Sequence, residues 1–481
     1  MSFASWSFVL LVATSVAAFY AFRSRTAQTA VLIAASAVFY GYGQPWLLTL
    51  LVGSAFINGL TSHLVRTSLI PRRRLALATL GVTTNLAILG LFKYGGLLGA
   101  TLGPAVHANR ALVDWLIGLP LPIGISFYTF QGISLVVDEF RGVGAVGTAD
   151  RGRGELAAAL PRFMADTMLF IMFFPQLVAG PILKAHDFYP QIAPKRLRDV
   201  NVGYAFKALV IGYFLKLVVA DNLAEQTFWM RWPYCEGHSS LILAALLIGY
   251  SAQIFADFAG YSLIAQGCAA LFGYRLFDNF NFPYIASSFS DFWRRWHISL
   301  SSWLREYLYI PLGGNRHGTT RTLINLLAVM VLGGMWHGAA WRYGAWGLLH
   351  GLALAGERLL FGPATGSRGA GEDARLTRWL RTGFVFAFVS FAWLFFVMPS
   401  MQEVWGFLVA VASNTRTPVA WWLGLVLGLY IVPVALYHVL GGIPAIRSRL
   451  PVVCVEFAYA AMLVAIAFNH GNSAPFIYFQ F

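Results

Sequence analysis

The stretch LINLLAVMVLGGMWHG, residues 323–338, is an apolar run that ends on a histidine between a tryptophan and a glycine. An ionisable side chain at membrane depth costs free energy unless it has a partner or faces a polar cavity, so His337 is by default a sign of function. A second tryptophan-flanked histidine, His297, ends the stretch Arg294-Arg295-Trp296-His297. These two histidines are the first candidates for chemistry in the chain.

The composition is that of a membrane protein. Of the residues, 58% are hydrophobic and only 11% are charged, whereas soluble domains carry about 25% charged residues. The apolar runs are continuous rather than alternating, which excludes an outer-membrane barrel and predicts an all-α fold. We expect a polytopic protein of about 11–13 helices, some of them short, broken or re-entrant, because a span needs about 20 apolar residues. The candidate spans are 5–22, 28–43, 46–62, 75–95, 111–139, 165–182, 204–220, 240–272, 321–336, 340–361, 383–398, 419–440 and 453–469.

The net charge of +14 follows the predicted topology. Arginines occupy alternate connections between spans, which is the positive-inside pattern and places the N-terminus outside the cytoplasm. Anionic lipid headgroups are then the expected counter-charge, and nucleic acid is not an expected partner. The arginines are Arg23 and Arg25, then Arg66 with Arg72 to Arg74, then Arg141, Arg151 and Arg153, then Arg368 to Arg381 and Arg447 to Arg449.

The chain carries no recognisable metal or hydrolase motif. Its three cysteines, Cys235, Cys268 and Cys454, have no metal-like spacing, so we expect no metal site. The patterns H-E-x-x-H, G-x-S-x-G and the phosphate-binding P-loop do not occur.

Residues 289–307 have apolar and aromatic positions in steps of three and four, with charged and hydroxyl side chains opposite them. This periodicity predicts one amphipathic helix, too polar to span, at the cytoplasmic membrane face. Its arginines then contact headgroups or an anionic ligand, and His297 points into the protein. The periodicity leaves open that His297 is only a structural, hydrogen-bonded residue.

His337 has a structural alternative too, as a packing histidine bonded to a backbone carbonyl. Gly333, Gly334 and Gly338 beside it favour close helix approach or a local break. Non-helical backbone at membrane depth is tolerated where it lines a cavity.

Five strings together resemble the membrane-bound O-acyltransferase family, and within it the bacterial branch that O-acetylates exported polysaccharide. The similarity runs through nearly the whole chain. The strings are PIGISFYTFQGISLVVDEFRG (122–142), FFPQLVAGPI (173–182), FADFAGYSLIAQGCAALFGYRLFDNFNFPY (255–284), SDFWRRWHISLSSWLREYLYIPLGGNR (290–316) and MWHGAAWRYGAWGLLHG (335–351).

The resemblance implies one membrane-embedded domain, residues 1–481, with helices around a central funnel in the bacterial inner membrane. Its core motifs are at 122–351, followed by C-terminal helices and an aromatic tail at 383–481. The family's invariant histidine corresponds to His337 and its second, more variable polar residue to His297. We expect Trp296 and Trp336 to contact substrate beside them.

The implied donor is cytoplasmic acetyl-CoA, bound as a substrate rather than as a tight cofactor. Arg294, Arg295 and Arg305 are the expected partners of its phosphates, with Lys184 a weaker candidate; contact with lipid headgroups is the alternative. His337 would be the general base, and His297 would orient the thioester carbonyl or donate to the oxyanion. An acetyl-imidazole on His337 is a second possible mechanism.

The aromatic terminus Phe476 to Phe481 contains one nucleophilic hydroxyl, that of Tyr478. The topology places this C-terminus on the periplasmic side, where an aromatic tail can serve as an interfacial anchor. The resemblance suggests instead that Tyr478 carries the acetyl group briefly.

The expected partner is a periplasmic SGNH-type acetyltransferase that places acetyl on polysaccharide. Composition alone would also fit a multi-helix transporter or flippase, although no repeat symmetry is evident. A carrier-protein thioester is an alternative donor. The polymer, which alginate, peptidoglycan or cellulose would equally satisfy, stays open, as do the acyl length and the oligomeric state.

Overall fold

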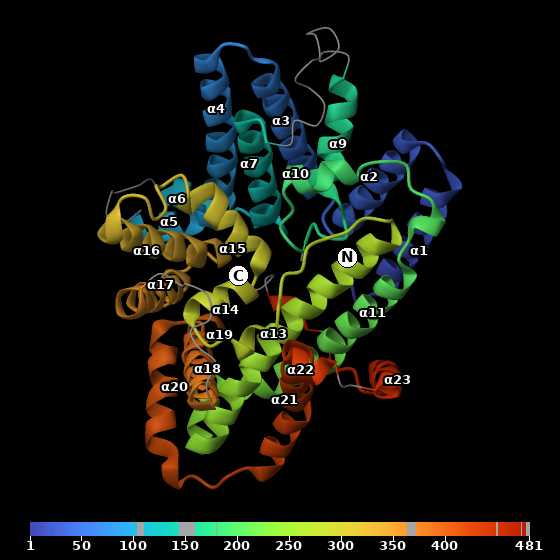
Figure 1. The fold of residues 1–481 in the computed structure, drawn as a ribbon. Coiled ribbons are helices and arrows are strands. Elements are labelled where there is room, and N and C mark those ends of the chain that lie inside the picture. The colour runs from blue at the N-terminus through green and yellow to red at the C-terminus, as the bar shows by residue number, and fades with distance from the viewer. Residues whose placement is uncertain are drawn as a thin grey trace. The chain divides into compact units, whose positions relative to one another are not determined.

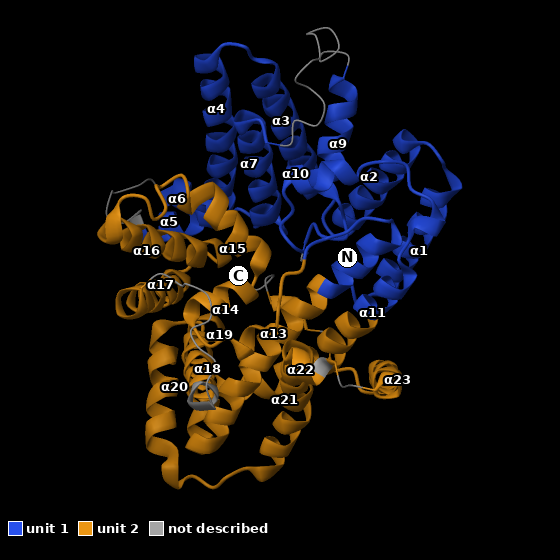
Figure 2. Ribbon diagram, in the orientation of Figure 1, with its two compact units in different colours: residues 1–209, 263–277 blue, residues 210–262, 278–481 orange. Residues whose placement is uncertain are grey.

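The computed structural model describes residues 1–102, 110–143, 159–178, 180–362, 372–448, 451–472 and 474–477. Throughout these ranges the regular elements are helices (Figure 1), which confirms the all-α prediction. The chain divides into two compact units, residues 1–209 with 263–277 and residues 210–262 with 278–481 (Figure 2). That it forms a single membrane domain stays a prediction.

Unit 1 is built from the N-terminal helices. In it α3 packs against α4, α7 and α9, and Asn58 of α3 and Asn85 of α4 exchange side-chain hydrogen bonds at 3.2 and 2.7 Å. Its helices are α1 (Trp6–Ala21), α2 (Arg25–Gly41), α3 (Leu47–Thr67), α4 (Pro71–Leu89), α5 (Gly95–Leu102), α6 (Arg110–Ile117), α7 (Ile125–Arg141), α9 (Leu160–Met172) and α10 (Ala185–Phe188).

Unit 2 holds the C-terminal helices. Two helices, α11 (Val202–Tyr213) and the long α13 (Ser240–Leu271), run from one unit into the other along the chain. The other helices of unit 2 are α12 (Asp221–Thr227), α14 (Phe289–Arg295), α15 (Ile298–Leu304), α16 (Gly318–His337), α17 (Trp341–Phe361), α18 (Glu372–Ala392), α19 (Leu394–Val397), α20 (Met401–Ser413), α21 (Trp421–Gly442), α22 (Pro444–Arg447) and α23 (Val452–Phe468).

The helices make this a multi-pass membrane protein. The described part of the chain contains seven helices that are long and apolar enough to span a membrane: Leu47–Thr67, Pro71–Thr101, Val202–Met230, Ser240–Leu271, Gly318–His337, Leu376–Val397 and Trp421–Gly442. Each coincides with a predicted span. The predicted first and last spans coincide with α1 and α23, which are apolar but shorter.

Two predicted spans are not continuous helices. The span predicted at 111–139 is divided into α6 and α7, because Pro120 and Pro122 lie between them and Gly124 has a φ of 77°. The span predicted at 165–182 ends as a helix at Met172, two residues before Phe174 and the proline that follows it. Both cases are the broken segments expected in general, but at positions that hydropathy did not mark.

Close packing of α16 on α17 depends on glycine. A Cβ atom on Gly334 would collide with the carbonyl of Tyr343 and the backbone of Gly347. A Cβ atom on Gly347 would collide in turn with the carbonyl of Met330. The predicted close helix approach before His337 is therefore confirmed.

Candidate functional site

His297 lies at a break in the segment predicted as one amphipathic helix. Helix α14 ends at Arg295 and α15 begins at Ile298, so the prediction of a continuous helix is wrong. His297 itself is in the left-handed region, with φ 43° and ψ 56°. Such a backbone is uncommon for a residue with a side chain and persists only where surrounding contacts hold it.

Asn279 supplies those contacts. Its carbonyl accepts the Ile298 backbone N–H at 2.9 Å, and its side-chain oxygen accepts the Ser299 hydroxyl at 2.6 Å. The neighbouring Asn281 N–H donates to the Arg295 carbonyl at 2.9 Å. The chain at 279–281 thereby satisfies backbone groups that a continuous helix would have used, and the break turns His297 into the interior.

His337 is the last residue of α16, and its ring meets that of His297. The helix ends before Gly338, whose backbone is extended, and a Cβ atom at this position would collide with the Tyr343 ring. The side chains of both histidines are buried, and their ring centroids are 6.4 Å apart. The structure thus brings together the two histidines that the sequence marked.

Aromatic rings enclose the pair. The His337 ring lies 5.1 Å from Trp336, 5.2 Å from Trp346 and 5.3 Å from Phe396, measured between centroids. The His297 ring lies 6.0 Å from Trp336 and 4.6 Å from Phe258. Trp336 therefore borders both histidines, and its contact with substrate stays a prediction.

Trp296 has a different environment. It is buried and packs on Phe292, Phe280 and Trp393, with centroids 5.7, 5.0 and 4.9 Å away. These contacts support the helix break next to His297. A role for Trp296 in substrate binding stays a prediction.

Burial sets the charge state of His297. His297 does not belong to any of the seven spanning helices, and its side chain is fully buried in the protein. Desolvation of the charged form lowers the pKa of His297 to about 3. The imidazole is therefore neutral near pH 7. A neutral imidazole has one N–H donor and one nitrogen acceptor, which suits orientation of a carbonyl group.

The three predicted phosphate-binding arginines differ in exposure and in their contacts with the protein. Arg294 and Arg305 are exposed. Arg295 is half-buried, and its Nε donates to Asp291 at 2.9 Å while its Nη1 donates to the Asn281 carbonyl at 3.2 Å. Arg295 thus helps to hold the helix break. Lys184, the weaker candidate, is buried in unit 1.

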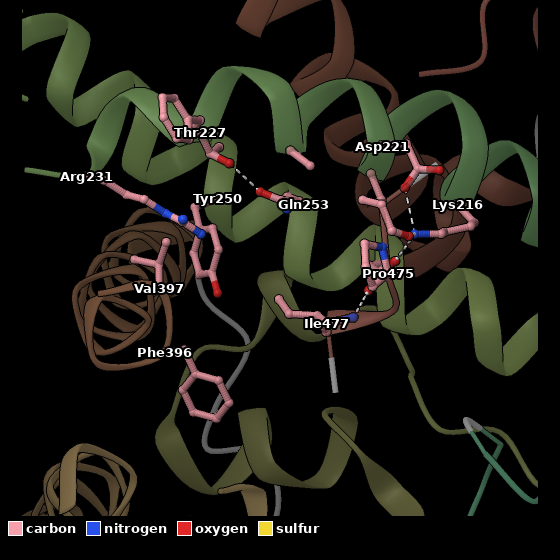
Figure 3. Close-up of a pocket in the computed structure, with 15 residues that line it drawn as sticks. Lys216, Asp221, Thr227, Arg231, Tyr250, Gln253, Phe396, Val397, Pro475 and Ile477 are labelled. Carbon is pink, nitrogen blue, oxygen red and sulfur yellow. Dashed lines mark hydrogen bonds and ion pairs between the residues drawn. The ribbon is translucent and has the colours of Figure 1, made fainter. Parts of the chain in front are cut away.

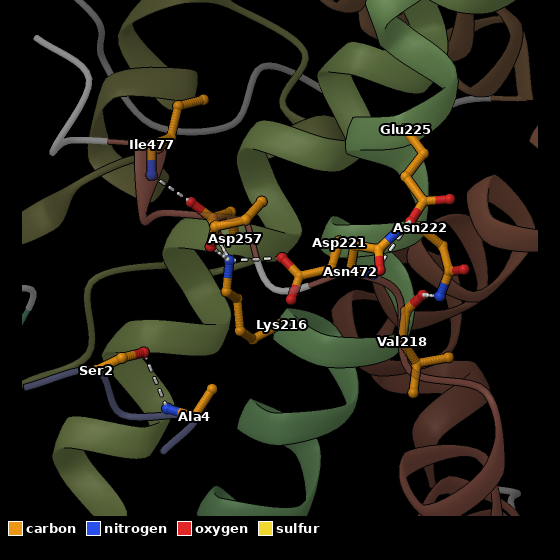
Figure 4. Close-up of polar contacts among 11 residues, drawn as sticks. Ser2, Ala4, Lys216, Val218, Asp221, Asn222, Glu225, Asp257, Asn472 and Ile477 are labelled. Carbon is orange, nitrogen blue, oxygen red and sulfur yellow. Dashed lines mark hydrogen bonds and ion pairs between the residues drawn. The ribbon is translucent and has the colours of Figure 1, made fainter. Parts of the chain in front are cut away.

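A buried charge cluster in unit 2 was missed by the sequence reasoning. Lys216 Nζ donates to Asp221 Oδ1 at 2.6 Å and lies 2.8 Å from Asp257 Oδ1 (Figure 4). The side chains of Lys216 and Asp221 are only 2% and 1% exposed. The available signal was an ionisable residue inside each of two apolar spans, which by itself indicates a functional or tightly paired group.

The C-terminal tail is attached to this cluster. Lys216 Nζ donates to the Ala474 carbonyl at 2.9 Å, and the Ile477 N–H donates to Asp257 Oδ2 at 2.8 Å. Phe476 is fully buried, with its ring 4.2 Å from Tyr261 and 5.9 Å from Phe258, measured between centroids. The part of the tail up to Ile477 is therefore inside the protein, and Tyr478 lies outside the described residues.

A cavity of about 200 Å³ lies beside the tail (Figure 3). Its lining includes the charge cluster, Arg231, Tyr250, Phe396 and the tail residues Ala474, Pro475 and Ile477. Phe396 also contacts the His337 ring. Arg342 fixes this part of α19 by donating to the carbonyls of Phe396 and Met398 at 2.7 and 2.6 Å. Phe396 therefore borders both the cavity and the His337 ring.

Comparison with known proteins shows the family of the chain. A family model for the membrane-bound O-acyltransferase family matches residues 164–401. A probable alginate O-acetylase (AlgI) of Azotobacter vinelandii is 37% identical over 70% of this chain and 62% of its own length. Another from Pseudomonas aeruginosa is 34% identical over 86% of this chain and 75% of its own length. A peptidoglycan O-acetyltransferase of Helicobacter pylori is 35% identical over 77% of this chain and 71% of its own length. The chain therefore belongs to the membrane-bound O-acyltransferase family.

Proposed function

We propose that this protein takes acetyl from cytoplasmic acetyl-CoA and passes it across the inner membrane for O-acetylation of an exported or cell-envelope polysaccharide. The single observation that carries the proposal is the buried pair of His297 and His337, whose rings are 6.4 Å apart. The names of its relatives, alginate O-acetylase and peptidoglycan O-acetyltransferase, support a polysaccharide acceptor. Membership of an O-acyltransferase family also favours the enzyme over the transporter alternative.

The reaction begins when the hydroxyl group of the acceptor lies within hydrogen-bond distance of the His337 imidazole. The imidazole takes the hydroxyl proton as the oxygen attacks the thioester carbonyl, and proton transfer of this kind contributes roughly 10²- to 10⁴-fold. The carbon–sulfur bond breaks, and the CoA thiolate leaves with the proton that His337 took up, which returns the imidazole to its neutral form. Neutral His297 orients the carbonyl and donates to the developing oxyanion. The aromatic rings around the pair exclude water, which would otherwise hydrolyse the thioester.

Tyr478 is the proposed first acceptor. Support comes from the residue before it, because Ile477 is buried and its backbone is bonded to Asp257. An anchor in the membrane interface would leave this part of the tail outside the helices. A phenol has a pKa near 10, so it needs a base such as His337 to attack at neutral pH. The aryl ester formed would pass acetyl to the next hydroxyl, and the phenol would be released.

The donor is proposed to enter from the cytoplasmic side. The exposed guanidinium groups of Arg294 and Arg305 would meet its phosphates with charge-assisted hydrogen bonds. Both termini of the chain would lie in the periplasm, as the alternation of arginine-rich connections predicts. A periplasmic SGNH-type acetyltransferase, whose serine would accept the group from Tyr478, is the proposed partner.

The test is the acetylation of polymer in cells that depend on this protein. We expect His337→Ala to abolish polymer-bound acetate at unchanged protein abundance in the membrane. His63→Gln is the matched control, since His63 is also a buried histidine of an apolar helix but belongs to unit 1. Near-normal acetylation by His337→Ala would disprove the proposal.

A further inference from the structure

We infer that Lys216, Asp221 and Asp257 form a clamp that holds the C-terminal tail in a fixed position beside the histidine pair. They are positioning residues, since they act through the tail. The importance of the clamp for acetyl transfer rests on the proposed function. The effect of the clamp on the position of the tail is independent of the proposed function and is tested separately.

The charges of the clamp need the tail. Burial of a charge is costly unless it is paired and hydrogen-bonded, and here one ammonium faces two carboxylates. The Ile477 N–H donates to the Asp257 carboxylate. The Ala474 carbonyl accepts a hydrogen bond from the Lys216 ammonium, which is the third contact of this group. The tail thereby supplies both a donor and an acceptor to a cluster built from two other segments.

The local backbone is shaped for this contact. Lys216 lies in the π-helical turn Phe214–Ala220, and α13 approaches it closely at Gly260. A Cβ atom on Gly260 would be 2.9 Å from the Gly212 carbonyl oxygen and 3.0 Å from the backbone nitrogen of Lys216. Glycine at 260 is therefore what permits Lys216 and Asp257, three residues earlier on α13, to meet.

Further contacts fix the register of the tail before it reaches the clamp. The Gly471 N–H donates to the Leu217 carbonyl at 2.9 Å. Figure 4 shows Asn472 beside Glu225, to which it donates through its backbone and its side chain, at 3.0 and 2.7 Å. Gly471 must lack a side chain, because a Cβ atom would collide with the Asn222 nitrogen. These contacts favour the register in which the chain enters the clamp.

One face of α13 links the clamp to the site. Asp257 bonds the tail, while Phe258 and Tyr261 receive the ring of Phe476. Phe258 also lies edge-on to His297 at 4.6 Å between centroids. The point from which the last four residues continue is therefore fixed relative to His297 by a single helix.

The competing explanation is that the cluster only joins the π-helical turn Phe214–Ala220 and α12 to α13, and that the tail merely packs against it. The two explanations differ in one measurable quantity, the amide hydrogen exchange of residues 474–477. The experiment uses the full-length protein in lipid nanodiscs. It compares the wild type with Lys216→Met, the rescue variant Lys216→Arg and the control Lys207→Met, which changes an exposed lysine of α11.

Loss of the ammonium should release the tail, so Lys216→Met should speed amide exchange in the tail by roughly tenfold or more, while α16 keeps its protection. Lys216→Arg should restore most of the protection, and Lys207→Met should resemble the wild type. Unchanged tail exchange in a folded Lys216→Met protein would overturn the inference. If Lys216→Met does not fold, Asp257→Asn, which keeps an acceptor oxygen but removes its charge, replaces it under the same criteria.

A second readout separates this inference from the proposed function. A released tail should lower kcat for acetyl transfer and leave KM for acetyl-CoA unchanged, because the donor site is intact. If His337→Ala fails to stop transfer but Lys216→Met frees the tail, the proposed function is wrong and the clamp stands. If the tail stays protected in Lys216→Met, the clamp is wrong whatever the activity.

Discussion

The imidazole rings of His297 and His337 lie 6.4 Å apart in the interior of one compact unit, and they come from two unlike positions. His297 occupies a strained break between two short helices, and His337 is the last residue of a long apolar one. Neither location is the regular interior of a helix. The orientation of each side chain is therefore set by the helix end at which it lies.

Removal of the hydroxyl from Tyr478 should stop acetyl transfer. Tyr478→Phe keeps the ring, so any anchoring by the tail is retained while the proposed acceptor is lost. We expect polymer-bound acetate to fall to background, with acetyl-CoA binding unchanged by isothermal titration. Wild-type acetylation by Tyr478→Phe would show that the aromatic tail is structural.

Charge reversal at Arg305 should weaken the binding of acetyl-CoA. Arg305→Glu replaces an exposed cation with an anion that repels phosphate, and the loss should be largest at low salt, where screening is weak. The measurement is the KM for acetyl-CoA as a function of ionic strength, with Arg198→Glu, an exposed arginine of unit 1, as the control. An unchanged KM at every salt concentration would leave Arg305 as a lipid contact. Arg295 is less suitable for this test, because reversal there also breaks its bond to Asp291.

His297 should make the fold sensitive to acid. Burial lowers its pKa to about 3, below its usual value, so between pH 6.5 and 3 the unfolded chain binds a proton that the folded chain does not. Stability from this residue is therefore full above pH 6.5 and is lost as the pH falls. The loss between pH 7 and pH 5 is about 2 kcal/mol. Thermal unfolding in detergent should show a smaller drop over this range for His297→Gln than for the wild type; equal drops would contradict the assignment.

The left-handed backbone at residue 297 should select among substitutions. Asn tolerates this conformation and can donate a hydrogen bond, whereas a β-branched side chain is strained there by about 1–3 kcal/mol. His297→Asn should thus fold and keep part of the transfer activity, and His297→Val should lower the melting temperature as well as the activity. Equal melting temperatures for the two variants would argue against a strained break.

Much of the helical framework could be predicted from the sequence. Each of the seven long apolar helices coincides with a predicted span, because burial in lipid requires runs of apolar residues whose length hydropathy measures directly. The breaks were less accessible. The interruption before Gly124 depends on prolines inside an apolar run, and that at His297 on hydrogen bonds from Asn279, a residue outside the periodic segment.

The site shows the same division. Tryptophan flanks and membrane depth pointed to His297 and His337, but their proximity is a tertiary contact that periodicity does not contain. The clamp was not predicted. Lys216 is a cation inside an apolar span, but its two carboxylate partners and the tail become its neighbours only through the packing of α12, α13 and the C-terminal segment.

The most direct test of the account is the transfer of label from acetyl-CoA by membrane vesicles that contain this protein. Inverted vesicles expose the cytoplasmic face to [¹⁴C]acetyl-CoA, and the label bound to protein and polymer is counted over time. We predict that His337→Gln slows this labelling by roughly 10²-fold or more while acetyl-CoA binding is retained. Labelling by His337→Gln at the wild-type rate would contradict the assignment of His337 as the catalytic base.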